Sequence, residues 1–116
     1  MKTLFILNDP PYGTERCYNA LRLATALQKA DPQMEVAIFL MADAAVAARA
    51  GQKTPDGYYN VERMLKRVLG HGRVLICGTC MDARGLEDSD LLEGARRSTM
   101  DELAGETLAA DRVLVF

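Results

Sequence analysis

Apolar residues in this chain gather into short continuous runs separated by longer amphipathic stretches. Four runs are rich in β-favouring residues: Thr3–Asn8, Glu35–Met41, Arg73–Cys77 and Arg112–Phe116. A continuous apolar run of this length is typical of a strand covered on both faces. We therefore predict four such strands, with a fifth, brief and polar, at Gly94–Arg97. A short charged strand suits the unprotected edge of a sheet.

Helical spacing of apolar residues fills most of the intervals between these strands. Capping residues, glycines and prolines mark where these helices begin and end. The predicted helical segments are Glu15–Lys29 with Thr14 as N-cap, an alanine-rich helix from Asp43 to about Ala50, a helix from Val61 ended by Gly70-His71-Gly72, a short turn at Asp88–Leu92, and a helix opened by a capping-box-like Ser98-Thr99-Met100-Asp101.

Strands that alternate with helices predict a parallel sheet with right-handed crossovers and helices on both faces, a three-layer α/β/α domain. All loops that follow strands then lie along one edge of the sheet, where such folds keep their binding crevices. We expect the loop around Pro10–Gly13, the segment after Met41 and the residues after Cys77 to meet there.

Composition adds limits to this picture. The chain has 116 residues, 49% apolar and 26% charged, which suits one soluble domain without disulfides. A net charge of −2 gives no basic excess, so neither nucleic acid nor a membrane surface is an expected partner. There is no signal-peptide pattern and no apolar run of the ~18 residues needed to span a bilayer. We expect a cytoplasmic protein with reduced thiols.

The motif Cys77-Gly78-Thr79-Cys80 stands where the third apolar strand ends. Four interpretations fit it: a redox dithiol, a persulfide carrier, half of a zinc site, or two packed cysteines. Zinc is disfavoured because only Cys17 and His71 remain as strong ligands, so we expect no metal. Cys17 falls on the apolar stripe of its helix, which favours packing.

A nucleotide site at the first loop is also disfavoured. Pro10 and Pro11 remove two backbone donors that a phosphate would need, and Asp9 and Glu15 add negative charge. The pattern G-x-G-x-x-G and a P-loop are both absent. We expect no cofactor.

Several other residues are candidates for the crevice. Arg84 would lower a thiolate pKa or hold an anionic sulfur donor, and Gly85 would let the chain turn back sharply. Asn8, Asp9 and Tyr12 lie on the loop facing the same edge. Each has an ordinary alternative, as a surface arginine or as turn residues. The long segment Gln52–Asn60 is a candidate binding loop or subunit contact.

Together these segments resemble the DsrE/DsrF-like family, in its YchN-like branch. The resemblance rests on Asn8–Glu15, Phe39–Ala44, Gly51-Gln52-Lys53 with Gly57-Tyr58-Tyr59-Asn60, Cys77–Cys80 with Arg84-Gly85, and Ala110–Phe116. It implies one DsrE-like domain over residues 1–116, of flavodoxin-like architecture, with five parallel strands in the order 4-3-2-1-5.

The resemblance also carries functional expectations. Members assemble as trimers or hexamers, and relatives in sulfur oxidation and transfer-RNA thiolation hold sulfur as a cysteine persulfide. The reactive cysteine of those relatives ends the third strand, with six residues between it and an Arg-Gly pair. That role falls on Cys77 first and Cys80 second, with Gly78 and Thr79 in the same pocket; Gln52, Tyr58 and Tyr59 are candidate subunit contacts.

Three functions are therefore in view. The first is a sulfur-relay protein, a candidate sulfurtransferase, that carries persulfide on Cys77 or Cys80 and works with donor and acceptor proteins. The second is a non-enzymatic oligomeric scaffold or small-molecule binding module with structural cysteines. The third is a dithiol redox protein.

Overall fold

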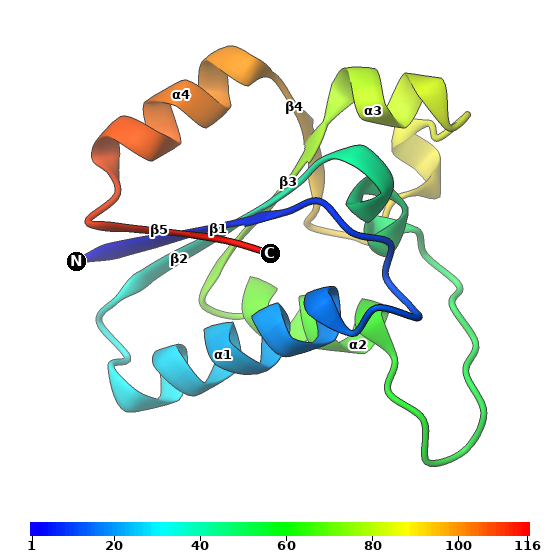
Figure 1. The fold of residues 1–116 in the computed structure, drawn as a ribbon, viewed down its shortest axis with the longest axis horizontal. Helices are drawn as coiled ribbons and strands as arrows, with labels where there is room; N and C mark the ends of the chain where they lie inside the picture. Colours follow the sequence, from blue (N-terminus) through cyan, green and yellow to red (C-terminus); the bar gives the residue numbers. More distant parts are fainter.

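A computed structural model describes residues 1–116 as five parallel strands with helices on both faces (Figure 1). The strand order is β4-β3-β2-β1-β5, which confirms the predicted fold class and order. The elements are β1 Lys2–Leu7, α1 Arg16–Ala30, β2 Glu35–Leu40, the 3₁₀ helix η1 Ala42–Ala48, α2 Val61–Leu69, β3 Gly72–Cys77, α3 Gly78–Ala83, η2 Asp88–Asp90, β4 Arg96–Ser98, α4 Met100–Ala109 and β5 Arg112–Val115.

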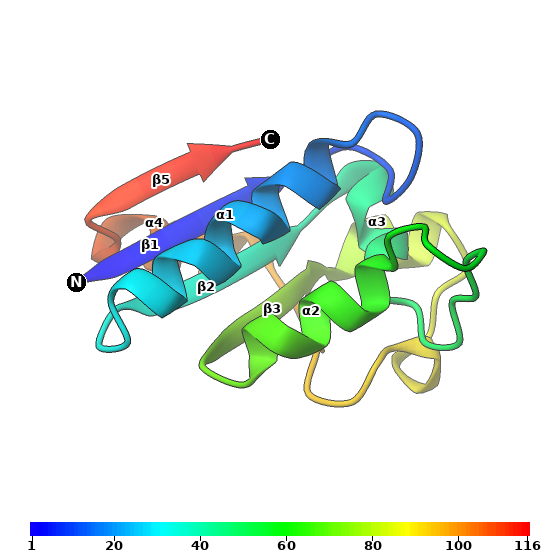
Figure 2. The same cartoon turned by 90° about the horizontal axis from the view of Figure 1, so that it is seen from below.

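The two faces of the sheet are covered unequally. Helices α1 and α2 lie side by side across one face, and α4 crosses the other (Figure 2). Alternate strand residues point to opposite faces, so Phe5 and Ile38 join a cluster of 21 buried residues under α1 and α2. Leu4 and Phe39 join a cluster of only 6 on the α4 side. The α4 face therefore has little apolar cover of its own.

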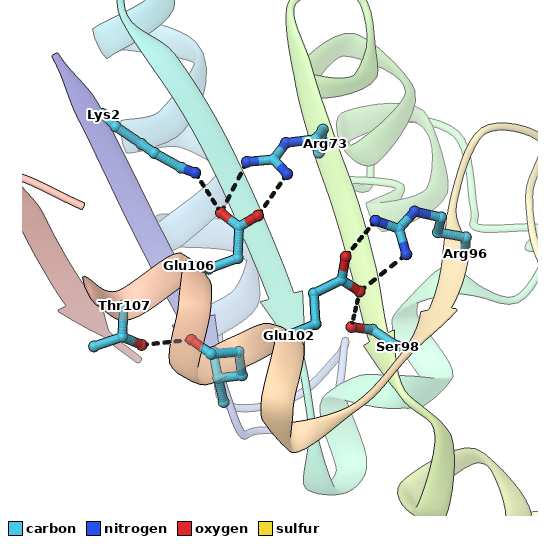
Figure 3. Close-up of polar contacts among 8 residues, drawn as sticks. Lys2, Arg73, Arg96, Ser98, Glu102, Glu106 and Thr107 are labelled. Atoms are coloured by element: carbon cyan, nitrogen blue, oxygen red, sulfur yellow. Dashed lines mark hydrogen bonds and ion pairs between the residues drawn. The ribbon is translucent and has the colours of Figure 1, made fainter. Parts of the chain in front are cut away.

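Polar contacts attach α4 to the sheet (Figure 3). The buried Glu106 carboxylate accepts hydrogen bonds from Lys2 at 2.7 Å and Arg73 at 2.8 Å. One turn earlier, Glu102 accepts from Arg96 at 2.9 Å and from the Ser98 hydroxyl. Of the apolar side chains of α4, only Leu103 joins the buried cluster, while Met100 and Leu108 are exposed.

Two predicted helix starts are wrong. Helix α1 begins at Arg16, after Glu15 at φ 64°, and the Thr14 hydroxyl accepts a hydrogen bond from the Arg16 N–H instead of capping the helix. The alanine-rich segment is a 3₁₀ helix opened by Met41, with Asp43 inside its first turn. The 3₁₀ helix ends at Ala48, whose carbonyl accepts a hydrogen bond from the Leu92 N–H (2.9 Å), and Arg49 then forms an antiparallel bridge with Leu91.

The boundary between β4 and α4 also differs from the prediction. Gly94 adopts φ 94° in a turn, so the strand starts at Arg96 and runs to Ser98, which pairs with Cys77. Because Ser98 belongs to the strand, Thr99 becomes the N-cap of α4, and its hydroxyl accepts from the Glu102 N–H at 3.1 Å. This shift puts Ser98 and Thr99 next to Cys77.

Candidate functional site

The two thiols occupy the junction between β3 and α3. Cys77 is the last residue of β3 and the N-cap of α3, and Cys80 lies within the first turn. Cys77 is 7% exposed and Cys80 is half-buried. A cavity of about 210 Å³ opens over Cys77, and its lining residues are Cys77, Gly78, Thr79, Arg97, Ser98, Thr99 and Met100. The first thiol is therefore recessed in a small cavity.

The surroundings of Cys77 favour its thiolate. Burial raises the pKa of this thiol, but hydrogen bonds from the Thr79 hydroxyl and from Cys80 outweigh burial and lower the pKa below its ordinary value. The Thr79 oxygen lies 3.3 Å from the sulfur and donates to it when the sulfur is a thiolate. A lowered pKa increases the fraction of Cys77 that is present as the nucleophilic thiolate.

Cys80 has the opposite character. Burial and the hydrogen bond it donates to Cys77 raise the pKa of Cys80. Its sulfur accepts a hydrogen bond from the Ala42 N–H at 3.2 Å. Ala42 adopts φ 51°, a left-handed conformation that is costly for a residue with a Cβ, and this conformation holds the donor in place. The two thiols thus form an asymmetric pair in which Cys80 keeps its proton.

Arg84 does not reach Cys77. Its guanidinium pairs with Asp43 at 2.8 Å and donates to the Cys80 carbonyl at 3.0 Å, so it ties α3 to η1. It lowers the pKa of Cys80 slightly against the larger raising effects. Gly85 follows at φ 66° and reverses the chain, the turn that its sequence position suggested.

Arg97 is the cation beside Cys77, and sequence reasoning missed it. Its guanidinium lies against Gly78, where an added Cβ would come within 2.7 Å of Nε. Asp82 holds it through two hydrogen bonds of 2.8 Å, which raise the pKa of Arg97. The expected strand order could have indicated Arg97. It places β4 beside β3, and the pairing of these two strands puts Arg97 opposite Ile76, the residue before Cys77.

The polar residues of the first loop make other contacts. The Asn8 amide groups donate to the Phe116 carbonyl, and Asp9 pairs with Arg16 at 3.5 Å. The Tyr12 hydroxyl donates to the Gln52 side chain and accepts from the Val61 N–H at 3.1 Å. None of Asn8, Asp9 and Tyr12 lines the thiol cavity.

The remaining candidates divide between packing and a second cluster. The Cys17 thiol is buried and donates to the Asp9 carbonyl at 3.1 Å, and burial raises its pKa to about 12. Tyr58 and Tyr59 stack on each other beside α1 and α2.

No three metal-ligating side chains come together. No helix has the length and apolar character that crossing a membrane requires.

Comparison with known proteins identifies one protein family. The sequence profile of the DsrE/DsrF-like family matches residues 1–116. Protein YchN of Escherichia coli is 40% identical over 99% of this chain and 98% of its own length. The uncharacterized protein MJ0989 of Methanocaldococcus jannaschii is also 40% identical, over the whole of both chains.

Solved structures agree. The crystal structure of YchN from Escherichia coli superposes with a TM-score of 0.95 and covers 100% of this chain and 99% of that one. The protein of unknown function MTH1491 from Methanobacterium thermoautotrophicum has a TM-score of 0.77 at 13% identity and covers 96% of each chain, which shows a shared fold alone.

Proposed function

The chain belongs to the DsrE/DsrF-like family, and on this premise we propose that it is a sulfur-relay protein that carries sulfur as a persulfide on Cys77. The observation behind the choice of residue is the asymmetry of the two thiols. Cys77 has the lowered pKa and faces the cavity, whereas Cys80 has the raised pKa. Cys80 is the second candidate.

The transfer is a thiolate exchange. The Cys77 thiolate attacks the outer sulfur of a donor persulfide, the bond between the two donor sulfurs breaks, and the donor leaves as a thiolate. Cys77 then holds the outer sulfur as a persulfide. An acceptor thiolate attacks this outer sulfur in turn and returns Cys77 to its thiolate form, so no external oxidant or reductant is consumed.

Two neighbours suit this exchange. The Thr79 hydroxyl, at 3.3 Å, stabilises negative charge on Cys77 before and after each transfer. The Arg97 guanidinium, held by Asp82, brings positive charge to the same cavity, where the attacking sulfur and the leaving sulfur of each transfer are thiolates. Cytoplasmic donor and acceptor proteins are the partners we propose.

Intact-mass analysis after incubation with a persulfide donor tests the proposal. We expect wild type to gain the mass of one sulfur atom, Cys77→Ser to gain none and Cys80→Ser to keep the adduct. Loss of the adduct with Cys80→Ser alone would move the role to Cys80. An internal disulfide without added sulfur would favour the dithiol redox function, and no change in wild type would refute the relay.

Self-assembly is a second proposal, and it also fits a scaffold without sulfur chemistry. Leu108 on α4 is 88% exposed, and Val115 on the terminal strand β5 is 64% exposed. An apolar edge strand is a site for association between copies. We expect light scattering to show a trimer or hexamer that Leu108→Lys dissociates and that Leu23→Lys, on α1, leaves intact. A monomeric wild type would refute assembly, and unreactive thiols in the intact oligomer would favour the scaffold.

A further inference from the structure

All four tyrosines of the chain gather in one cluster beside α1 and α2. The ring centroids of Tyr18 and Tyr59 are 4.3 Å apart, those of Tyr58 and Tyr59 are 4.5 Å apart, and Tyr12 stacks on Tyr59 at 5.4 Å. These distances suit favourable aromatic pairs. The rings come from the first loop, from α1 and from the 52–60 loop, and they form one aromatic wall.

Three arginines line a cavity of about 290 Å³ beside this wall, and the Arg22 guanidinium lies over the Tyr18 ring, 5.3 Å from its centroid. Arg22 comes from α1, and Arg63 and Arg67 come from successive turns of α2. None of them takes part in any of the seven ion pairs of the structure. Like charges one helical turn apart repel each other. In a chain of net charge −2, this concentration of unpaired positive charge suits an anionic ligand.

The walls of the cavity are fixed by hydrogen bonds. The Gln52 N–H donates to the Glu62 carboxylate at 2.9 Å, and the Gln52 side chain donates to the Ala47 carbonyl at 2.8 Å. The Asn60 amide donates to the Gln52 carbonyl at 3.1 Å, while its oxygen caps α2. The loop that carries Tyr58 and Tyr59 is therefore anchored at both ends.

The hydroxyl of Tyr59 is buried inside the tyrosine cluster, beside Tyr58 and the Gly13 backbone, and burial raises the pKa of Tyr59 to about 12. Only the ring of Tyr59 forms part of the cavity wall. A ligand in the cavity would therefore contact aromatic surface and the arginine side chains rather than this hydroxyl.

We propose that this cavity binds a nucleoside monophosphate, with its base on the exposed ring of Tyr58 and its phosphate on Arg63 and Arg67. Bases of any kind stack on aromatic side chains, and guanidinium groups bind phosphate through paired hydrogen bonds. A volume of about 290 Å³ is at the small end for ligand sites, which suits one nucleotide. A nucleic-acid strand would need a longer basic track. The site is separate from the thiols and does not depend on sulfur transfer.

Calorimetric titration of the wild-type protein at low salt with AMP, adenosine, ribose 5-phosphate and inorganic phosphate tests the proposal. We expect one AMP per chain, bound at least about tenfold more tightly than each fragment, because ring and phosphate contribute separately. Absence of AMP binding at millimolar concentration, or phosphate binding as tight as AMP, would overturn it. Binding of an oligonucleotide but not AMP would do the same.

Charge-removing variants on one helix locate the site. Arg63→Gln and Arg67→Gln are expected to weaken AMP binding about tenfold each. Lys66→Gln is the matched control, because Lys66 is exposed on the same helix, pairs with Glu62 and does not line the cavity. We expect it to change affinity less than twofold. Equal weakening of AMP binding by all three variants would refute the site and favour a general charge effect. An oligomer of changed molar mass in Arg63→Gln, with AMP binding unchanged, would also refute it and favour a subunit contact.

Discussion

The hydrogen bond from Thr79 to Cys77 is the contact on which the reactivity of the site depends most directly. Replacing Thr79 by Val keeps the shape of the side chain and removes the hydroxyl, 3.3 Å from the sulfur. Among the hydrogen bonds that lower the pKa of Cys77, the one from this hydroxyl contributes most, although burial acts in the opposite direction. We therefore expect Thr79→Val to raise the pKa of Cys77 and to slow its reactions.

The size of the effect follows from the exposure of the two groups. A hydrogen bond to a charged group contributes about 1.5–3 kcal/mol. Cys77 is only 7% exposed, but Thr79 is exposed, so water replaces part of the lost interaction. We take about 0.7–1.4 kcal/mol as the net loss, which corresponds to about a three- to tenfold smaller thiolate fraction.

The assay is the rate of alkylation by iodoacetamide at several pH values, with the modified peptide identified by mass spectrometry. We expect Thr79→Val to react about three to ten times more slowly than wild type below the pKa of Cys77. Thr79→Ser, which restores a hydroxyl, should regain most of the rate. If Thr79→Val alkylates as fast as wild type, the hydroxyl does not stabilise the thiolate and the reasoning fails.

Three further predictions follow from the same structure. Gly78→Ala should displace the Arg97 guanidinium, because the added Cβ would lie 2.7 Å from its Nε. We expect alkylation of Cys77 to slow about twofold and the midpoint of urea unfolding to change little. An unaltered alkylation rate would show that Arg97 does not affect the thiol. Ala42→Gly should raise the free energy of unfolding by about 0.5–1 kcal/mol, because glycine adopts φ 51° without strain, and a loss of stability in urea titration would contradict this. Glu106→Gln should lower the free energy of unfolding by about 1–2 kcal/mol at pH 7. Burial raises the pKa of Glu106, but the hydrogen bonds from Lys2 and Arg73 lower it below 4.5. The stabilisation by the Glu106 carboxylate is therefore complete above pH 4.5 and is lost as the pH falls through the folded pKa. If the difference in free energy of unfolding between wild type and Glu106→Gln is the same at pH 3 as at pH 7, Glu106 does not act as an ion pair.

Local sequence patterns were enough to predict the sheet and the position of the thiols. Apolar runs identified both ends of β1, β2, β3 and β5 to within one residue, because a strand buried on both faces needs such a run wherever it occurs. The end of the third run placed Cys77 at the carboxyl edge of the sheet. The strand order came from the resemblance to the family, since periodicity alone contains no pairing information.

Helix starts were less predictable, because several neighbouring residues can serve as caps. Thr14 and Ser98 both have capping side chains, yet Glu15 and Thr99 hold the N-cap positions. In the second case the pairing of Ser98 with Cys77 decides the matter, and that pairing is a tertiary contact.

The local turn and the tertiary structure together decided the character of each thiol. The hydrogen bonds that lower the pKa of Cys77 come from Thr79 and Cys80 in the adjoining turn, whereas the other neighbours come from distant segments. Arg97 reaches the Cys77 cavity because β4 pairs with β3, and the Ala42 N–H reaches Cys80 across 38 positions of sequence. Arg84, the nearer cation in sequence, pairs with Asp43 instead. Sequence determines where a nucleophile stands along the chain, through local periodicity and turn chemistry. Donors from the same turn can also be read from the sequence. Only the packing of distant segments, however, brings the Arg97 guanidinium and the Ala42 N–H to the thiols.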